Sequence, residues 1–167
     1  MGERPSEEFK VTMPGPTSVG TATFLADTVL LIRDTVINDN VTDPISATRP
    51  SGERFCLSAY PRRAVSYPVV TVVDRGISNW KKGGMASTVM IQDFSIEIRC
   101  WCRNVVERDE ISQDILDELR SRMNTLSTTQ LLHNFRISSM VNVDDPEGGE
   151  QNIKSKVITI TCTQIIG

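Results

Sequence analysis

The sequence predicts an α+β fold in a single domain: a mainly antiparallel sheet with two helices packed on one face. Two observations predict this class. Segments with an apolar residue at every second position, typical of strands, flank two segments with the 3.6-residue spacing of amphipathic helices. The chain also has 167 residues, 39% of them hydrophobic, which is enough for one core without disulfides or a metal ion.

The first helix is predicted over residues 21–38. Its apolar stripe consists of Leu25, Val29, Ile32 and Val36, spaced as successive turns of one helix face. Residues 1–20 contain three prolines and three glycines without sustained periodicity, so we expect a flexible N-terminal arm there. The folded domain is therefore predicted to comprise residues 21–167.

An extended, turn-rich excursion is predicted over residues 41–68, because its four prolines each favour extended geometry in the preceding residue. A short strand is possible within residues 55–59. The β-branched residues 69–74 then indicate a strand buried on both faces. Gly76 and residues 81–84 predict that a loop follows this strand.

The clearest strand is predicted over residues 89–103. Its even-numbered positions are apolar except for Gln92, and its odd-numbered positions are mostly polar. Fifteen extended residues would span roughly 50 Å at ~3.3 Å per residue, against a domain diameter near ~40 Å. Two alternatives remain open: the strand curls with the sheet twist, or it projects as half of a long hairpin.

The second helix is predicted to begin at Asn104, which resembles an N-cap with Glu107 three residues later. It should run for about five turns. Its buried face would contain Ile111, Ile115, Leu116, Leu119, Met123 and Leu126. Strands at 135–143 and 153–166, joined by an acidic turn at 145–149, complete the predicted order.

The charge distribution is uneven although the net charge is only −3. Residues 1–50 carry four basic and seven acidic side chains, residues 51–103 carry eight and four, and residues 104–167 carry six and ten. Such asymmetry suits a protein that packs one face against a different face of its neighbour. No apolar run is long enough to cross a bilayer, and the N-terminus lacks a signal sequence. We therefore expect that the chain does not associate with a membrane. We also expect that it is synthesised in a reducing, intracellular compartment.

The inventory of reactive residues argues against an enzyme. A single histidine, His133, cannot supply a two-histidine metal site, and the four cysteines form no C-x-x-C pair. No nucleophile elbow or phosphate-binding loop is present. We therefore expect no catalytic residue, no cofactor and no metal.

Candidate interface residues come from the basic middle segment and the polar strand face. The candidates for contact with a neighbouring subunit or partner are Arg62, Arg63, Trp80, Lys81, Lys82 and Trp101. Their expected counterpart is the acidic outer face of the second helix in a neighbouring copy. The same basic segment, together with Arg49 and Arg54, leaves nucleic-acid binding open as another use.

The whole-chain pattern over residues 20–166 resembles the tail-terminator, or tail-completion, proteins of long-tailed viruses. The resemblance rests on chain size, on element order, and on three segments. These segments are the junction between strand and second helix at 96–109, Thr42-Asp43-Pro44-Ile45, and Tyr60-Pro61-Arg62-Arg63.

The resemblance implies a structural virion protein assembled in the host cytoplasm. It would form a ring, expected to be a hexamer, at the head-proximal end of the tail tube. There it would stop polymerisation of the major tail tube protein and join the tail to the neck, while viral DNA passes through the lumen unrecognised. A head-tail connector or head-closure protein is the alternative of the same class. A small nucleic-acid-binding accessory protein is the alternative of another class.

Overall fold

The computed structural model describes residues 24–59, 65–84, 89–128, 132–144 and 153–166. Five strands form one sheet in the order β1-β2-β3-β5-β4, with β1 parallel to β2 and every other neighbouring pair antiparallel. This confirms the predicted α+β class. The elements are α1 (Phe24–Leu30), η1 (Leu31–Asn38), β1 (Cys56–Leu57), β2 (Val69–Lys82), β3 (Met90–Cys102), α2 (Val105–Thr128), β4 (His133–Asp144) and β5 (Lys154–Ile166). The predicted arm, residues 1–20, and the predicted acidic turn, residues 145–149, lie outside the described residues.

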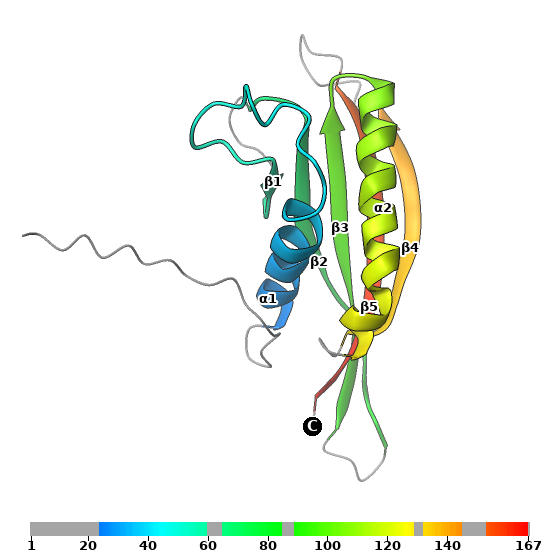
Figure 1. Cartoon of the computed structure of the whole chain (residues 1–167). Helices are drawn as coiled ribbons and strands as arrows, with labels where there is room; N and C mark the ends of the chain where they lie inside the picture. The colour runs from blue at the N-terminus through cyan, green and yellow to red at the C-terminus, as the bar shows by residue number, and fades with distance from the viewer. Residues whose placement is uncertain (1–23, 60–64, 85–88, 129–131, 145–152, 167) are drawn as a thin grey trace, which may run out of the picture.

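Both helical segments lie on one face of the sheet (Figure 1). The apolar, even-numbered positions of β3 lie beneath them, and Phe94, Ile96 and Ile98 are fully buried. The facing side of α2 contributes Ile115 and Leu119, which are also fully buried. The predicted stripes are therefore confirmed as the core, and no described helix covers the other face of the sheet.

The predicted first helix is confirmed over residues 24–38, while residues 21–23 lie outside the described residues. Its second half, η1, is a π-helix. Its buried residues, Leu31, Ile32, Val36 and Ile37, recur at a spacing of five. The wider turn brings both of these pairs to the core, whereas an α-helix would rotate one member of each away. At the end of η1, the side-chain amide of Asn40 donates to the carbonyl oxygens of Thr35 at 2.7 Å and Val36 at 3.1 Å.

The prediction of a loop from Gly76 onward is wrong, because β2 continues to Lys82. The ladder between β2 and β3 shifts register between Asp74 and Gly76 and again between Ser78 and Lys81. Gly76 and Asn79 have positive φ angles, 95° and 53°, at these shifts. The turn-forming residues therefore make bulges within a strand instead of ending it.

The β2–β3 hairpin projects beyond both helices at the lower end of the sheet in Figure 1. Of the two alternatives for the long strand, the projecting one is therefore observed. β5 pairs with β3 along the whole of β3, from Cys102 opposite Lys154 to Met90 opposite Ile166. Gln92, which interrupts the apolar face, is buried opposite Gln164 and donates a 2.7 Å hydrogen bond to it.

The N-cap predicted for the second helix is confirmed. The side-chain oxygen of Asn104 accepts a 2.9 Å hydrogen bond from the backbone N–H of Glu107. The Glu107 carboxylate in turn accepts from the backbone N–H of Arg103 at 3.0 Å. The helix is longer than predicted, with 24 residues.

Within the described ranges, no helix is long and apolar enough to cross a membrane.

Candidate functional site

The outer half of β2, on the projecting hairpin, is exposed to solvent. Every β2 residue from Asp74 to Lys82 is exposed, and Trp80 retains 69% of its accessible surface. Lys81 and Lys82 follow Trp80 directly, so three of the predicted interface residues lie together. Ile77, 47% exposed, adds a second apolar side chain to this surface.

Local backbone geometry places Trp80 on this surface. Asn79 and Trp80 fall within the second register shift, where the paired positions advance from Ser78–Asp93 to Lys81–Ile91. The side chain of Asn79 donates a 3.1 Å hydrogen bond to Asp93 on β3, which anchors the bulge. Because Asn79 tolerates the left-handed conformation better than most residues, the bulge is encoded locally.

Trp101, also predicted as an interface residue, lies far from Trp80. Lys81 pairs with Ile91, and Trp101 lies ten residues further along the same strand, roughly 33 Å away at ~3.3 Å per residue. Its indole N–H donates to the Thr71 hydroxyl at 3.1 Å, and the Arg99 guanidinium stacks 3.8 Å from the ring centroid. Trp101 is therefore half-buried in contacts within its own sheet. Arg62 and Arg63 lie outside the described residues.

A hollow of about 680 Å³ lies at the base of the hairpin, on the sheet face opposite the helices. We call it the sheet-end hollow. It spans β2, β3, β5 and β4, and its polar lining includes Lys81, Asp93, His133, Arg136 and Thr163. Sequence reasoning missed Asp93 and Arg136 as site residues, because only pairing across four strands brings them together.

Asp93 is the central acidic group of the sheet-end hollow. Its carboxylate accepts hydrogen bonds from the Thr163 hydroxyl at 2.6 Å and from Asn79 at 3.1 Å. The hydrogen bond from Thr163 lowers the pKa of Asp93 most. The bond from Asn79 and the charges of Lys81 and Arg136 lower this pKa further. Asp93 is therefore ionised at neutral pH and flanked by two cations.

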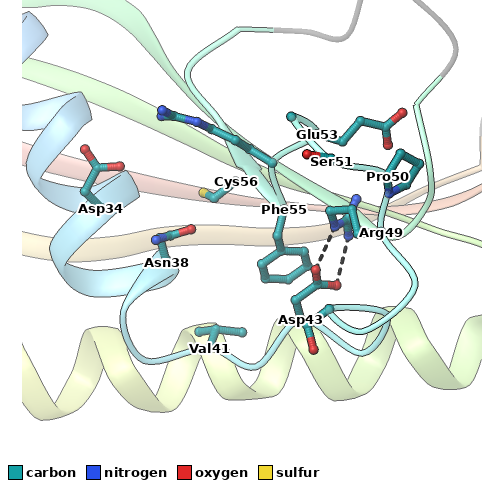
Figure 2. Close-up of a pocket in the computed structure, with 13 residues that line it drawn as sticks. Asp34, Asn38, Val41, Asp43, Arg49, Pro50, Ser51, Glu53, Phe55 and Cys56 are labelled. Carbon is teal, nitrogen blue, oxygen red and sulfur yellow. Dashed lines mark hydrogen bonds and ion pairs between the residues drawn. The ribbon is translucent and has the colours of Figure 1, made fainter. Parts of the chain in front are cut away.

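The described cations of the basic middle segment, which exclude Arg62 and Arg63, do not converge on one surface. The side chain of Arg49 is buried within the excursion, and Figure 2 shows its guanidinium beside the carboxylate of Asp43. Its guanidinium binds Asp43 at 2.7 and 2.9 Å and donates to the backbone oxygens of Ser66 and Pro68, each at 2.7 Å. Arg49 therefore anchors the excursion and has no free face for a nucleic acid.

Arg54 is exposed, but it belongs to the end of the sheet opposite the hairpin tip. It lies two residues before Cys56, which pairs with Val70, and Val70 in turn pairs with Cys100. Lys81 is paired with Ile91, nine residues along β3 from Cys100. Arg54 and Lys81, which were expected to act together, are thus separated by roughly 30 Å at ~3.3 Å per residue.

The acidic outer face of α2, the predicted counterpart, is partly neutralised within the chain. Asp109 forms ion pairs with Arg108 at 2.9 Å and Lys156 at 2.7 Å. Asp117 contacts Arg120 at 3.4 Å, and Glu118 contacts Arg122. Glu110 and Asp114 are exposed on the same helix.

The described residues offer little reactive chemistry. All four cysteines are buried and reduced, and burial raises the pKa of the Cys56, Cys100 and Cys162 thiols to about 12. Among the described residues, no group of three or more His, Cys, Asp or Glu side chains gathers where it could hold a metal ion.

The chain was compared with known proteins. No protein-family model matches it, and no curated protein matches it significantly.

Proposed function

We propose that this chain is a structural virion protein. In this proposal it forms a ring, expected to be a hexamer, at the head-proximal end of the viral tail tube. The ring stops polymerisation of the major tail tube protein and joins the tail to the neck or head-closure protein. It assembles in the host cytoplasm, and viral DNA passes through its lumen without specific recognition.

The projecting hairpin is the observation that carries this proposal. Trp80 is 69% exposed and Ile77 is 47% exposed, on a hairpin that extends beyond both helices. Tryptophan is enriched in the buried centres of protein interfaces, where it contributes much of the binding energy. A neighbouring subunit that covers this surface would remove both side chains from water.

The shape of the molecule favours a head-to-tail arrangement. The hairpin lies at one end of the sheet, and a copy that receives it on another part of its own sheet does so with a different surface. Contacts between two different surfaces generate a ring when the rotation between copies closes. A ring of this kind has two unlike faces, as a junction between tail tube and neck requires. The resemblance over residues 20–166 supports the same role.

Electron microscopy and light scattering test the proposal. The purified chain should form rings alone or on tubes of its tail tube protein, and added chain should halt tube growth. Trp80→Ala should weaken ring formation, whereas Val106→Ala, at a 65% exposed position on α2, should leave it unchanged. A chain that stays monomeric both alone and with tube protein contradicts the proposal. Rings that bind neck protein but not tubes would favour a connector or head-closure protein.

Nucleic-acid binding is the candidate of another class, and Lys81, Lys82 and Arg136 favour it. None of the three forms an ion pair within the described part of the chain. Gel-shift affinity that falls steeply with salt and is lost in Lys81→Ala/Lys82→Ala would support this function. Affinity that is unchanged in that variant would argue against it.

A further inference from the structure

The projecting part of the β2–β3 hairpin is basic. Residues 75–92 contain Arg75, Lys81 and Lys82 and no acidic residue. Arg75 forms an ion pair with Glu97 at 2.5 Å. Lys81 and Lys82 are exposed, and neither has an ion-pair partner among the described residues. The two lysines are therefore available to a partner molecule.

The acidic residues near these lysines do not cancel their charge. Asp93 lies between two cations, because the charges of Lys81 and Arg136 both lower its pKa. Asp74 pairs with β3 five positions away from the pairing partner of Lys81. That is roughly 16 Å at ~3.3 Å per residue, which exceeds the ~8–10 Å screening length of physiological salt. Lys82 adds a further positive charge, so the outer hairpin stays positive.

The first half of α2 presents the opposite charge. Residues 109–118 contain five acidic residues and no basic one. Three of the five have cationic partners within the chain, and these are Asp109, Asp117 and Glu118. The other two, Glu110 and Asp114, are exposed and have no ion-pair partner in the described part of the chain. Like charges four residues apart repel one another on a helix face, so cations from outside would stabilise this stretch.

The hairpin lysines cannot reach these carboxylates within one chain. Lys156 binds Asp109 at 2.7 Å, and it pairs with β3 nine positions away from the pairing partner of Lys81. This separation is roughly 30 Å at ~3.3 Å per residue. Asp114 follows Asp109 by five residues and is thus at most about 7.5 Å closer, at ~1.5 Å per helical residue. The remaining distance exceeds the reach of a lysine side chain, and Figure 1 shows the hairpin extending away from α2.

We infer that the hairpin of one copy docks on the outer face of α2 of a second copy, with Lys81 and Lys82 against Glu110 and Asp114. A second copy is the occupant because the two complementary surfaces belong to the same chain and cannot meet within it. The inference rests on the ring-forming function proposed above and names the contact that sets the register between subunits.

The contact has the properties that a ring requires. Complementary charges set register and steer association. Trp80 directly precedes Lys81 and is 69% exposed, so docking of the lysines brings its ring against the same helix. Because the contact joins two different surfaces, it is head-to-tail and can close into a ring.

Charge reversal tests the contact. One variant is Lys81→Glu/Lys82→Glu, and its counterpart is Glu110→Lys/Asp114→Lys. Each alone should weaken self-association at least about tenfold, because each places like charges against one another. An equimolar mixture should restore association with the two variants alternating, and so should all four changes in one chain.

Two single reversals elsewhere are the matched controls. Arg54→Glu and Asp39→Lys change charge at exposed positions outside the hairpin and α2, and both should associate as the wild type does. Circular dichroism checks that each variant is folded. Sedimentation at about 50 mM and about 500 mM salt gives the readout, since exposed pairs weaken as salt shortens the screening length.

The outcomes separate this contact from the proposed function. Full association of either reversed variant, or loss without rescue in the mixture and in the fourfold variant, overturns the inference. Rings of normal size in the reversed variants would leave the proposed function standing while removing this contact. A wild-type chain that stays monomeric at about 1 mM, where even a contact with a Kd near that value is populated, would also overturn the contact. Tube capping by that chain would then test the proposed function separately.

Discussion

Replacing Arg49 tests whether the excursion is held by one buried cation. Its side chain is 6% exposed, and that of its partner Asp43 is 14% exposed. Arg49→Met keeps most of the aliphatic stem but removes four hydrogen bonds, two to Asp43 and one each to the backbone oxygens of Ser66 and Pro68. Removing one partner of a buried ion pair typically costs about 3–5 kcal/mol, because the other charge stays behind unpaired. We expect the free energy of unfolding to fall by about 3 kcal/mol.

Urea denaturation followed by circular dichroism measures this loss. Arg54→Met is the matched control, because Arg54 is exposed in the same excursion, and it should change stability by no more than about 0.5 kcal/mol. The double variant Asp43→Asn/Arg49→Met should lose less free energy of unfolding than the sum of the losses in the two single variants. If Arg49→Met lowers the free energy of unfolding by less than about 1 kcal/mol, the excursion does not depend on this cation. Water would then solvate Asp43 in place of the guanidinium at little cost in free energy.

The pH dependence gives an independent check on the same pair. Burial alone would raise the pKa of Asp43, but hydrogen bonds from Arg49 and the Ile45 backbone, with the Arg49 charge, hold that pKa below its usual value. A lowered pKa in the folded state stabilises the protein above the unfolded pKa of about 4, and this contribution disappears as the pH falls through the folded value. Without Arg49, burial should raise the pKa of Asp43, so the deficit of Arg49→Met should shrink below about pH 4.

Three further predictions concern other parts of the sheet. Trp101→Phe should lower the free energy of unfolding by about 1 kcal/mol, because the hydrogen bond to Thr71 is lost. Trp80→Ala should change this free energy by no more than about 0.5 kcal/mol. Equal effects of the two variants in thermal denaturation would contradict the difference in burial. Gln92→Leu alone should lower the free energy of unfolding by about 1–3 kcal/mol, because it leaves the Gln164 amide unpaired. Adding Gln164→Leu should recover most of this free energy. No recovery in the double variant would mean that the two amides are not coupled. The hydrogen bonds from Arg108 and Lys156 lower the pKa of Asp109 to about 2. The stabilising contribution of Asp109 should therefore be lost as the pH falls from about 4 to about 2. Lys156→Met should weaken this acid dependence, which a series of melting temperatures at different pH values measures.

Local periodicity was sufficient to predict much of the fold. The alternation along β3, the stripe on α2 and the Asn104 cap each depend on residues a few positions apart, and each is confirmed. The end of β2 was predicted wrongly for the same reason. Gly76 and residues 81–84 favour a turn when judged locally, but β2 pairs with β3 as far as Lys82 and accommodates Gly76 in a bulge.

The remaining features depend on partners far away in the chain. Gln92 looked like a flaw in an apolar face because its partner, Gln164, lies 72 residues away. Arg49 looked like a free cation because its acceptors come from both ends of the excursion. The sheet-end hollow takes residues from four strands, so no local signal marked Asp93 or Arg136. Trp80 was named as an interface candidate because its neighbours are basic and turn-forming, and it is 69% exposed in the structure.

The uninterrupted ladder between β3 and β5 also has a mechanical consequence. Thirteen consecutive residue pairs join these strands, from Cys102–Lys154 to Met90–Ile166, without a register shift. A pull on the hairpin tip along the strand axis would load these pairs in shear, all at once, whereas a pull across the sheet would open them one at a time. The hairpin is therefore stiff in the direction of the strands, and a partner gripping its tip would transmit force directly into the centre of the sheet.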